Sequence, residues 1–389
     1  MKILVIDPRC TDGSNLYFYT MGLAEGLSSV SEVTVASVSI CSKPSDAKFR
    51  VKRVFYPFSE KMKPGKIRQL LRGVEYISGY FYLLVHTLLH KYDVIHVEWP
   101  ILYRADVYFY KILKKHTSVF SLKAHNILPH STGIKYENVF KIIYSIPDVI
   151  EVHGEKIQHE FQQLFPESAG KVVIQKHGVF MNHDISYDEM RINDGIKNRI
   201  RQFNRIYLFL GRIDSDKGVD RLVSIWNHEF DNKESLLVIA GKVSANYNEF
   251  DETEKKIKKS NNILYIPGFV DDNLLNYLVS KCNLIILPYK NGSMSGVAFT
   301  AAEFGRPLLC TNFGAIEEYI EDKDTGFISK NTDEDLLNYW KYIDAYISNN
   351  ELEAIGNNMR KSFNESFTWE SIGRKLNYVY SELCSKNLK

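Results

Sequence analysis

Two cations that follow an apolar run could hold an anion. The run RIYLFLG ends at Gly211 and continues as GRIDSDKGVDRL, which places Arg212 at the end of an expected strand and Lys217 at the mouth of the next expected helix. Two cations and a helix N-terminus that converge on one anion suit a diphosphate. If the diphosphate is a leaving group, donors already in place stabilise the charge that develops in the transition state. A surface turn whose charges face water is the competing interpretation.

The stretch NGSMSGVAFTAAEFGRP (291–307) offers a complementary arrangement. Small residues between Gly292 and Gly296 let a ligand approach the backbone, and a helix with free N–H groups follows them. Glu303 comes seven residues after Gly296, so on a helix it returns to the same face about 10 Å along the axis. Phosphates at the helix start would place a ribose near this carboxylate. The alternative makes Ser295 a plain N-cap and Glu303 an exposed helical charge.

Asp214 and Asp216 match a D-x-D spacing that coordinates a divalent metal in some enzymes. The spacing is common, and capping of a helix start together with solvation explains this pair better. We therefore predict no metal site.

The elements that must position these residues follow an α/β pattern. Short apolar runs, typical of strands covered on both faces, alternate with segments of helical length. The expected strands are 2–7, 32–40, 93–99, 118–125, 148–154 and 171–178, and then 205–211, 236–243, 262–270, 283–289 and 307–314.

A polar segment, 181–198, separates the two series and resembles a linker. We expect two Rossmann-like domains with mostly parallel sheets that face a cleft between them, because open parallel sheets bind ligands beyond the carboxyl ends of their strands. The expected domains are 1–183, joined by the C-terminal helix 368–389, and 184–367.

Composition excludes several other classes of protein. The 389 residues contain 49 Lys and Arg against 47 Asp and Glu, a net charge of +2, so no nucleic-acid partner is indicated. The five cysteines show no zinc-ligand or C-x-x-C spacing, which indicates reduced thiols in a cytoplasmic protein. The longest apolar stretch, 76–90, is shorter than the roughly 20 residues of a membrane span.

The order and separation of several motifs resemble a known family. GRIDSDKGVDRL, YIPGFVDDNLLNYLVSKCNLIILPY, SGVAFTAAEFGRPLLCTNFGAIEEYI and DTGFI are similar to the C-terminal half of a GT-B-fold retaining glycosyltransferase of family 4 (glycosyl transferases group 1). The N-terminal half is similar less specifically, through PRCTDGSNLYFYTMGLAEGL, DVIHVEWP, LKAHNILPH and KHGV. The resemblance covers almost the whole chain.

The resemblance implies roles for individual residues. Arg212 and Lys217 would bind the diphosphate of a nucleoside diphosphate sugar, and Glu303 would bind its ribose. Backbone N–H groups of Gly296 and Val297 would contact phosphate and sugar. These roles need neither a metal nor a cofactor.

In the N-terminal half, Gly13 would face the donor phosphates and His125 would lie near the transferred sugar. One position departs from the pattern. Where the family usually has a glutamate that contacts this sugar, the chain has Ser295, whose hydroxyl makes weaker hydrogen bonds than a carboxylate. The donor's identity stays open at this position.

The implied function is transfer of a sugar, with retention, to a glycan or lipid-linked acceptor in cell-surface polysaccharide synthesis, such as capsule, exopolysaccharide or lipopolysaccharide. The leaving diphosphate would serve as base toward the acceptor hydroxyl. Two alternatives stay open: a non-catalytic subunit that binds a nucleotide sugar, and a nucleotide-sugar epimerase of GT-B-like fold. An oxidoreductase is disfavoured, because no G-x-G-x-x-G follows the first strand.

The segment 61–84 places five cations before an aromatic and aliphatic run. A basic amphipathic stretch of this kind can lie on the anionic inner face of the cytoplasmic membrane. A solvated loop followed by a core helix is the alternative. The cations are Lys61, Lys63, Lys66, Arg68 and Arg72.

Overall fold

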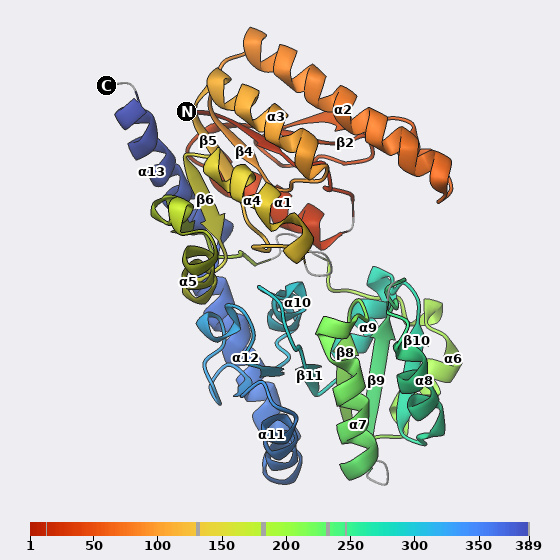
Figure 1. Cartoon of the computed structure of the whole chain (residues 1–389). Coiled ribbons are helices and arrows are strands. Elements are labelled where there is room, and N and C mark those ends of the chain that lie inside the picture. Colours follow the sequence, from red (N-terminus) through yellow and green to blue (C-terminus); the bar gives the residue numbers. More distant parts are fainter. Residues whose placement is uncertain (13, 130–132, 180–183, 231–233, 246, 388–389) are drawn as a thin grey trace. The chain divides into compact units, whose positions relative to one another are not determined.

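A computed structural model describes residues 1–12, 14–129, 133–179, 184–230, 234–245 and 247–387 (Figure 1). The chain divides into two compact units. Unit 1 is Met1–Met181 together with Phe367–Lys389, and unit 2 is Asn182–Ser366. Each unit is a Rossmann-like α/β layer structure around a parallel sheet.

Unit 1 contains a seven-stranded parallel sheet in the order β3-β2-β1-β4-β5-β6-β7. Its strands are β1 (Lys2–Ile6), β2 (Glu32–Val38), β3 (Arg50–Phe55), β4 (Tyr92–Val97), β5 (Thr117–Lys123), β6 (Val149–Val152) and β7 (Val172–Ile174). Its α-helices are α1 (Asn15–Ser28), α2 (Lys66–Leu89), α3 (Tyr103–Leu113), α4 (Gly133–Ser145), α5 (Glu155–Leu164) and α13 (Trp369–Asn387). Short 3₁₀ turns are η1 (Ser59–Lys61), η2 (Lys114–His116) and η3 (Pro166–Lys171).

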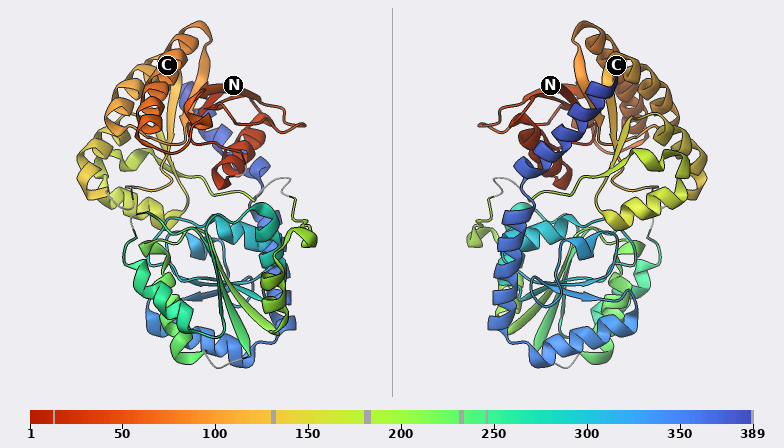
Figure 2. Two further views of the ribbon diagram at one scale, coloured as in Figure 1. Left: turned by 90° about the vertical axis from the view of Figure 1, so that its right-hand side faces the viewer. Right: turned by 90° about the vertical axis from the view of Figure 1, so that its left-hand side faces the viewer.

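The helices of unit 1 cover both faces of its sheet. Helices α2, α3 and α4 lie on one face, and α1 with α13 lies on the other (Figure 1), as right-handed crossovers on either side of β1 require. Helix α13 crosses α1 in both views of Figure 2. A Cβ at Gly26 would lie 2.0 Å from the carbonyl oxygen of Trp369, and one at Gly22 would lie 2.1 Å from its indole nitrogen. Glycine therefore permits this close approach.

Unit 2 contains a six-stranded parallel sheet in the order β10-β9-β8-β11-β12-β13. Its strands are β8 (Arg205–Leu210), β9 (Ser235–Gly241), β10 (Ile263–Pro267), β11 (Leu284–Leu287), β12 (Leu308–Thr311) and β13 (Phe327–Ser329). Its α-helices are α6 (Asp194–Arg201), α7 (Val219–Glu229), α8 (Phe250–Lys259), α9 (Asp272–Lys281), α10 (Gly296–Glu303), α11 (Asp333–Tyr346) and α12 (Asn349–Ser366). Its 3₁₀ turns are η4 (Glu189–Arg191), η5 (Ser215–Lys217) and η6 (Ile316–Glu318).

The core of unit 2 shows why its strands were readable from the sequence. Every residue of β9 is buried, as expected for a strand covered by helices on both faces. Trp226, Phe230 and Trp340 pack together against Tyr207 of β8, with the three ring centres 4.6–5.5 Å apart. Each buried apolar side chain of this kind contributes about 1.5–3 kcal/mol.

The structure adds two strands to those predicted and changes the linker. Strand β3, with the sequence RVKRVF, has three charged residues among its six and lies at the edge of its sheet, and β13 has three residues. Neither produces the continuous apolar run on which the prediction relied. The predicted linker contains η4 and the beginning of α6, because Asn193 caps that helix by accepting a hydrogen bond from Gly195 N at 2.8 Å.

Candidate functional site

Lys217 is a largely buried cation at the carboxyl end of the sheet in unit 2. Its side chain is 15% exposed, and its Nζ lies 3.2 Å from Asp216 Oδ2 and 4.1 Å from the centre of the Tyr289 ring. Burial lowers the pKa of Lys217, and Asp216 opposes this effect. The positive charge of Arg212 also lowers this pKa, so the two cations lie within electrostatic reach of each other. An anion bound beside both would relieve their repulsion.

Arg212 is the exposed member of this pair of cations. It follows Gly211, whose φ of +124° ends β8 in a conformation that favours glycine. The Arg212 side chain is 57% exposed, and its guanidinium lies 3.5 Å from Asp214 Oδ2. The end of β8 therefore presents a solvent-accessible guanidinium.

A tight turn brings Lys217 to the small-residue loop before α10. Lys217 lies in η5, one residue before Gly218, which has a φ of +68°, rather than inside the following helix. A Cβ at Gly218 would lie 1.9 Å from Pro288 O, so glycine lets the turn dock on the loop after β11. A Cβ at Gly292 would lie 3.8 Å from Lys217 Nζ. Lys217 and Gly292 are far apart in the sequence, which therefore offered no indication that these two loops meet.

Ser295 occupies the N-cap position of α10 without acting as a side-chain cap. The residue is buried, and its Oγ lies 3.2 Å from the hydroxyl oxygen of Tyr289. Burial raises the pKa of Tyr289 to about 12, and Ser295 opposes this effect. Ser295 is therefore more than a plain N-cap: it belongs with Tyr289 and Lys217 to one cluster, in which sequence reasoning missed Tyr289.

Helix α10 runs from the glycine at the loop to Glu303. Its first residues meet the end of β8, since a Cβ at Gly211 would lie 3.7 Å from Val297 Cγ2. The six residues after Gly296 are buried, whereas Glu303, the last residue of the helix, is partly exposed. The helix is eight residues long, so Glu303 lies about 10 Å along its axis from Gly296.

The two aspartates of the D-x-D pair have different partners. Asp214 caps η5 by accepting a hydrogen bond from Ser215 N at 2.9 Å, and it also accepts one from the Ser244 hydroxyl at 2.8 Å. Asp216 pairs with Lys217. The cap is thus Asp214, whereas we had assigned capping to the pair as a whole. Among the described residues, no group of three or more His, Cys, Asp or Glu side chains could hold a metal ion.

In unit 1, His125 belongs to a buried hydrogen-bonded cluster. Its Nε2 lies 2.7 Å from Glu98 Oε2, and its Nδ1 lies 3.2 Å from His153 Nε2. The ring stacks on Trp99 with centres 4.0 Å apart. Burial lowers the pKa of His125 to about 4, although Glu98 opposes this effect. The imidazole is therefore neutral at neutral pH.

His125 is one member of a polar row beneath α1 and α13. Consecutive strands contribute polar side chains at alternate positions, and pairs of them bond across the sheet. His96 Nδ1 lies 2.8 Å from Ser121 Oγ, and the Tyr380 hydroxyl of α13 donates to Glu151 Oε1 at 3.0 Å. The members of this polar row are His96, Glu98, Ser121, Lys123, His125, Glu151, His153, Gln175 and His177, and all of them are buried.

The polar row was missed by sequence reasoning, although its period of two was present in the strand sequences. Histidine and glutamate alternate with apolar residues in HVE (96–98) and EVH (151–153). In a parallel sheet such residues share one face. Burial lowers the pKa of Lys123 to about 7 and that of His177 to about 3.

Gly13, predicted to face the donor phosphates, lies outside the described residues. Around it, Ser14 caps α1 by accepting a hydrogen bond from Tyr17 N at 3.1 Å. Thr20 of α1 donates to Asp7 Oδ2 at 2.6 Å. Burial raises the pKa of Asp7 to about 7, with a further contribution from Glu98.

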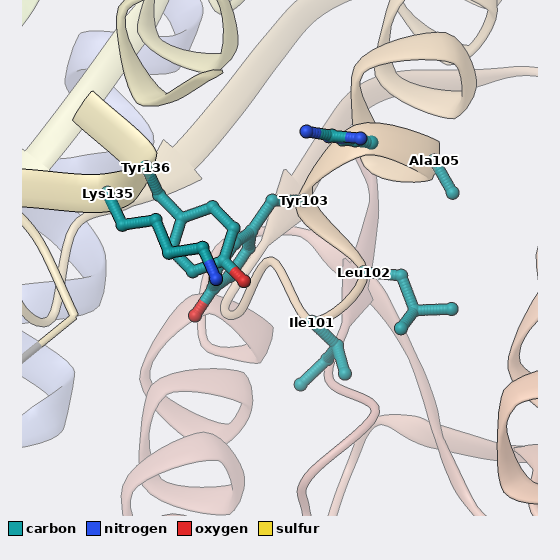
Figure 3. Close-up of a pocket in the computed structure, with 7 residues that line it drawn as sticks. Ile101, Leu102, Tyr103, Ala105, Lys135 and Tyr136 are labelled. Carbon is teal, nitrogen blue, oxygen red and sulfur yellow. The ribbon is translucent and has the colours of Figure 1, made fainter. Parts of the chain in front are cut away.

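A pocket of about 680 Å³ opens in unit 1 where β4 and β5 lead into α3 and α4 (Figure 3). The rings of Tyr103 and Tyr136 lie 5.0 Å apart, edge to face. In Figure 3, the side chain of Lys135 runs beside these two rings. The lining residues are Ile101, Leu102, Tyr103, Arg104, Ala105, Lys135 and Tyr136.

Comparison with known protein families matches this chain to one of them. Residues 191–362, which contain Arg212, Lys217 and all of α10, match the family described as glycosyl transferases group 1.

Curated proteins show the same relationship at low identity. An uncharacterized glycosyltransferase of Methanocaldococcus jannaschii is 22% identical over 249 residues, which cover 61% of this chain and 60% of that protein. The capsular polysaccharide biosynthesis glycosyltransferase CapM of Staphylococcus aureus is 20% identical over 259 residues, covering 64% of this chain and 66% of that protein. The match thus spans less than two thirds of the length of these two relatives, 60% and 66%.

Solved structures share the fold over nearly the whole chain. Sucrose-phosphate synthase of Thermosynechococcus elongatus has a TM-score of 0.72 at 17% identity and covers 99% of this chain and 100% of its own. Anabaena HepE in complex with UDP-glucose has a TM-score of 0.66 at 14% identity, with coverage of 98% and 100%.

The GT-B fold predicted from the sequence is confirmed in its two parallel-sheet, Rossmann-like units. The family resemblance is confirmed as well. The segment that matches the glycosyl transferases group 1 family carries the two cations that follow β8 and the whole of α10, and the chain as a whole has a GT-B fold.

Proposed function

We propose that this glycosyltransferase is a retaining enzyme of family 4 that takes its sugar from a nucleoside diphosphate sugar bound by unit 2. The observation that carries the proposal is the placement of Lys217. A buried ammonium group lies beside the glycine loop that begins α10 and within electrostatic reach of exposed Arg212. A diphosphate carries the negative charge that complements these groups.

The proposed reaction balances around the anomeric carbon. Its bond to the diphosphate oxygen breaks, and a bond to the acceptor oxygen forms on the same face of the sugar. The acceptor proton passes to the departing diphosphate, which keeps the electron pair of the broken bond. Arg212 and Lys217 stabilise the charge on the leaving group, as preplaced cations do.

Residues of α10 and its N-cap are proposed to bind the rest of the donor. Glu303 would accept hydrogen bonds from the ribose hydroxyls, while N–H groups of Gly296 and Val297 would face phosphate and sugar. Ser295 would contact the transferred sugar through a neutral hydroxyl. Because its Oγ already lies 3.2 Å from the Tyr289 hydroxyl, we expect Tyr289 to orient that contact.

Unit 1 is proposed to be the acceptor side, with His125 near the transferred sugar. A pKa near 4 means that this histidine holds no positive charge at neutral pH. Glu98 and His153 lie within hydrogen-bonding distance of its two ring nitrogens. We therefore propose that neutral His125 fixes the Trp99 ring stacked on it, rather than transferring a proton.

The printed names of two relatives support a role in cell-surface polysaccharide synthesis. CapM of Staphylococcus aureus is named for capsular polysaccharide biosynthesis, and another relative, 23% identical, is named a 41.2 kDa protein in the cps region of Klebsiella pneumoniae. We propose a glycan or lipid-linked acceptor on this basis. A cytoplasmic location, from which such acceptors are reached at the inner face of the membrane, stays a prediction.

A thermal-shift panel of nucleoside diphosphates and their sugars tests the donor site. A ligand specific for the native state raises the melting temperature in proportion to its affinity. The sugar donor that gives the largest shift is then incubated with the protein, and nucleoside diphosphate release and the anomeric configuration of the product are measured by NMR. No shift with any nucleotide overturns the proposal, and inversion overturns the retaining mechanism. Binding without turnover would favour a non-catalytic subunit.

A peripheral contact with an anionic membrane through 61–84 is also proposed. In the part of the chain that the structure describes, no helix is both long and apolar enough to cross a membrane. Helix α2 instead carries an exposed apolar stripe on the face opposite its buried residues. The stripe consists of Ile67, Leu70, Val74, Ile77, Phe81, Val85 and Leu88, which are 38–75% exposed.

The exposed charges around this apolar stripe are positive. Glu75, the single acidic residue of α2, is buried and accepts a hydrogen bond from Phe58 N at 2.8 Å. Arg68 and Arg72, two of the five cations noted in the sequence, pair with Glu60. The exposed lysines Lys61, Lys63 and Lys66 stand at one end of the stripe. An apolar stripe with lysines at its end suits an anionic lipid surface.

Vesicle flotation tests the membrane contact. The double variant Leu70→Glu/Phe81→Glu should lose binding to anionic vesicles at low salt, because it places two carboxylates in the apolar stripe. Tyr346→Glu, at an equally exposed site on α11, is the control and should bind as wild type does. Wild-type protein that does not float with anionic vesicles would disprove the contact.

A further inference from the structure

The pocket at the start of α3 and α4 lies outside the residues assigned to the donor. It forms where the first residues of both helices follow neighbouring strands, β4 and β5, at the carboxyl edge of the sheet in unit 1. Its volume of about 680 Å³ falls within the range of small-ligand pockets. The pocket is therefore large enough to hold one or two sugar units.

The lining of the pocket is cationic. Arg104 and Lys135 are both exposed, and the seven lining residues include no carboxylate. Neither cation forms an ion pair with any residue that the structure describes. The charge of Arg9 also reaches Tyr103, whose pKa it lowers against the larger, raising effect of burial.

The acidic residue that follows Ala105 of the lining bonds to protein groups rather than to the two cations. Asp106, on the first turn of α3, is buried, and its Oδ2 accepts a hydrogen bond from Ile101 N at 2.7 Å. Its Oδ1 accepts one from the Tyr76 hydroxyl at 2.6 Å. Burial raises the pKa of Asp106 to about 7. The carboxylate thus shapes the loop without neutralising Arg104 and Lys135.

The two tyrosines provide the other half of a recognition surface. Tyr103 and Tyr136 are packed edge to face, and Lys135 Nζ lies 5.8 Å from the centre of the Tyr136 ring (Figure 3). An aromatic face can pack on the apolar side of a sugar ring, while ammonium and guanidinium groups bind phosphate oxygens. The same ligand can use both if a phosphate is attached directly to a sugar.

We infer that this pocket binds the acceptor by a sugar–phosphate group, with the sugar against Tyr103 and Tyr136 and the phosphate held by Arg104 and Lys135. The inference rests on the proposed transferase function and names the acceptor's chemical class. Two sources share this chemistry, a lipid-linked sugar phosphate and a water-soluble one. The hydrogen bond from Tyr76 of α2 to Asp106 joins the pocket to the helix that carries the exposed apolar stripe.

Binding measurements with defined probes test the inference. Glucose 1-phosphate and inorganic phosphate are titrated calorimetrically, and a polyprenyl phosphate sugar is presented in zwitterionic vesicles. Arg104→Gln/Lys135→Gln should weaken sugar phosphate binding about tenfold or more, since charged hydrogen bonds of about 1.5–3 kcal/mol are lost. Arg104→Lys/Lys135→Arg should restore much of it. Lys111→Gln, which removes an exposed cation of the same helix, is the matched control.

The aromatic half of the pocket has its own test. Tyr136→Leu should weaken binding of glucose 1-phosphate while leaving inorganic phosphate unchanged, and Tyr136→Phe should resemble wild type. Binding in solution identifies the water-soluble source, and binding only in vesicles identifies the lipid-linked one.

The inference fails if wild type binds none of these probes, or if the double glutamine variant binds them as tightly as wild type. The proposed function fails separately, when no nucleotide sugar is bound or turned over while sugar phosphate binding persists. Nucleotide binding of the double glutamine variant should equal that of wild type, because Arg104 and Lys135 are not among the residues proposed to bind the donor.

Discussion

Charged groups at the carboxyl ends of the two sheets differ in burial and in pairing. In unit 1 the polar row is buried and bonded internally, so that Glu98 lies 3.0 Å from His96 and 2.7 Å from His125. In unit 2 the Arg212 side chain is 57% exposed at the end of β8. Burial without a ligand drives ionisable groups toward neutral or paired states. An exposed guanidinium keeps its charge for a ligand.

This difference suggests that the polar row of unit 1 serves stability and that the cations of unit 2 serve ligand binding. The polar row of unit 1 shifts pKa values in both directions: burial lowers that of Lys123 to about 7 and raises that of Asp7 to about 7. Such groups specify how α1, α13 and the sheet fit together. The cations of unit 2 are positioned by glycine turns, and Arg212 remains accessible. Substitutions should therefore affect stability in the first region and turnover in the second.

The largest effect is expected for Arg212→Ala and Lys217→Ala. Each removes a cation that we propose stabilises the leaving diphosphate, so kcat for donor turnover should fall about 100- to 1000-fold. Melting temperatures should change much less. Lys255→Ala, which removes a solvent-exposed ion pair with Glu252 on α8, should leave kcat unchanged. If the Lys255 variant were as slow as the other two, the assignment to a specific site would be wrong.

The next effect concerns stability in unit 1. Gly26→Val introduces a side chain where a Cβ alone would lie 2.0 Å from Trp369 O, so the free energy of unfolding should fall by about 1–3 kcal/mol or more. Gly73→Ala, at a helix position with open space around it, should instead be neutral or slightly stabilising. Chemical denaturation measures both. Equal stability of the two variants would contradict the tight packing of α1 on α13.

A smaller effect is expected for Glu303→Ala. Loss of a carboxylate that accepts two hydrogen bonds from a ribose should weaken nucleoside diphosphate binding about tenfold. Glu303→Gln should lose less, and Glu353→Ala, an exposed site on α12, should lose nothing. Calorimetry provides the affinities. An unchanged affinity for Glu303→Ala would remove this residue from the proposed donor site.

The smallest effect is a pH dependence that belongs to the polar row. Burial lowers the pKa of His177 to about 3, so below pH 6.5 the unfolded chain binds a proton that the folded chain does not. This one group should reduce the free energy of unfolding by about 1 kcal/mol between pH 7.5 and 5.5. His177→Gln should therefore lose less stability than wild type over this interval. Parallel melting curves for the two proteins would contradict the burial of a neutral histidine.

The site in unit 2 was largely predictable because its parts are local. Arg212 follows an apolar run, and Glu303 ends a helix that begins at a glycine; both patterns fall within a dozen residues. Partners distant along the chain were not predictable. Tyr289 contacts both Lys217 and Ser295, and nothing in a single sequence marks an aromatic residue as the meeting point of two loops.

In unit 1, by contrast, most of the polar contacts could not be predicted from the sequence. The strand sequences contained the alternation of His96 with Glu98 and of Glu151 with His153, but the pairing across the sheet depends on strand order. Cys10 and Cys41 appeared unrelated in the sequence, yet their sulfur atoms lie 3.4 Å apart in a buried position, both as free cysteines. Sequence separation carries no information about such contacts.

The sequence by itself therefore determined the two α/β units, the glycine-led helix α10 and the cations that follow β8, because hydrophobic period and turn chemistry are properties of neighbouring residues. The tertiary structure alone decided that Lys217 lies beside Tyr289, that nine polar side chains form one buried row, and that Asp106 accepts a hydrogen bond from Tyr76. These contacts join residues far apart in the chain, and they form only when the parallel strands bring their carboxyl ends to one edge.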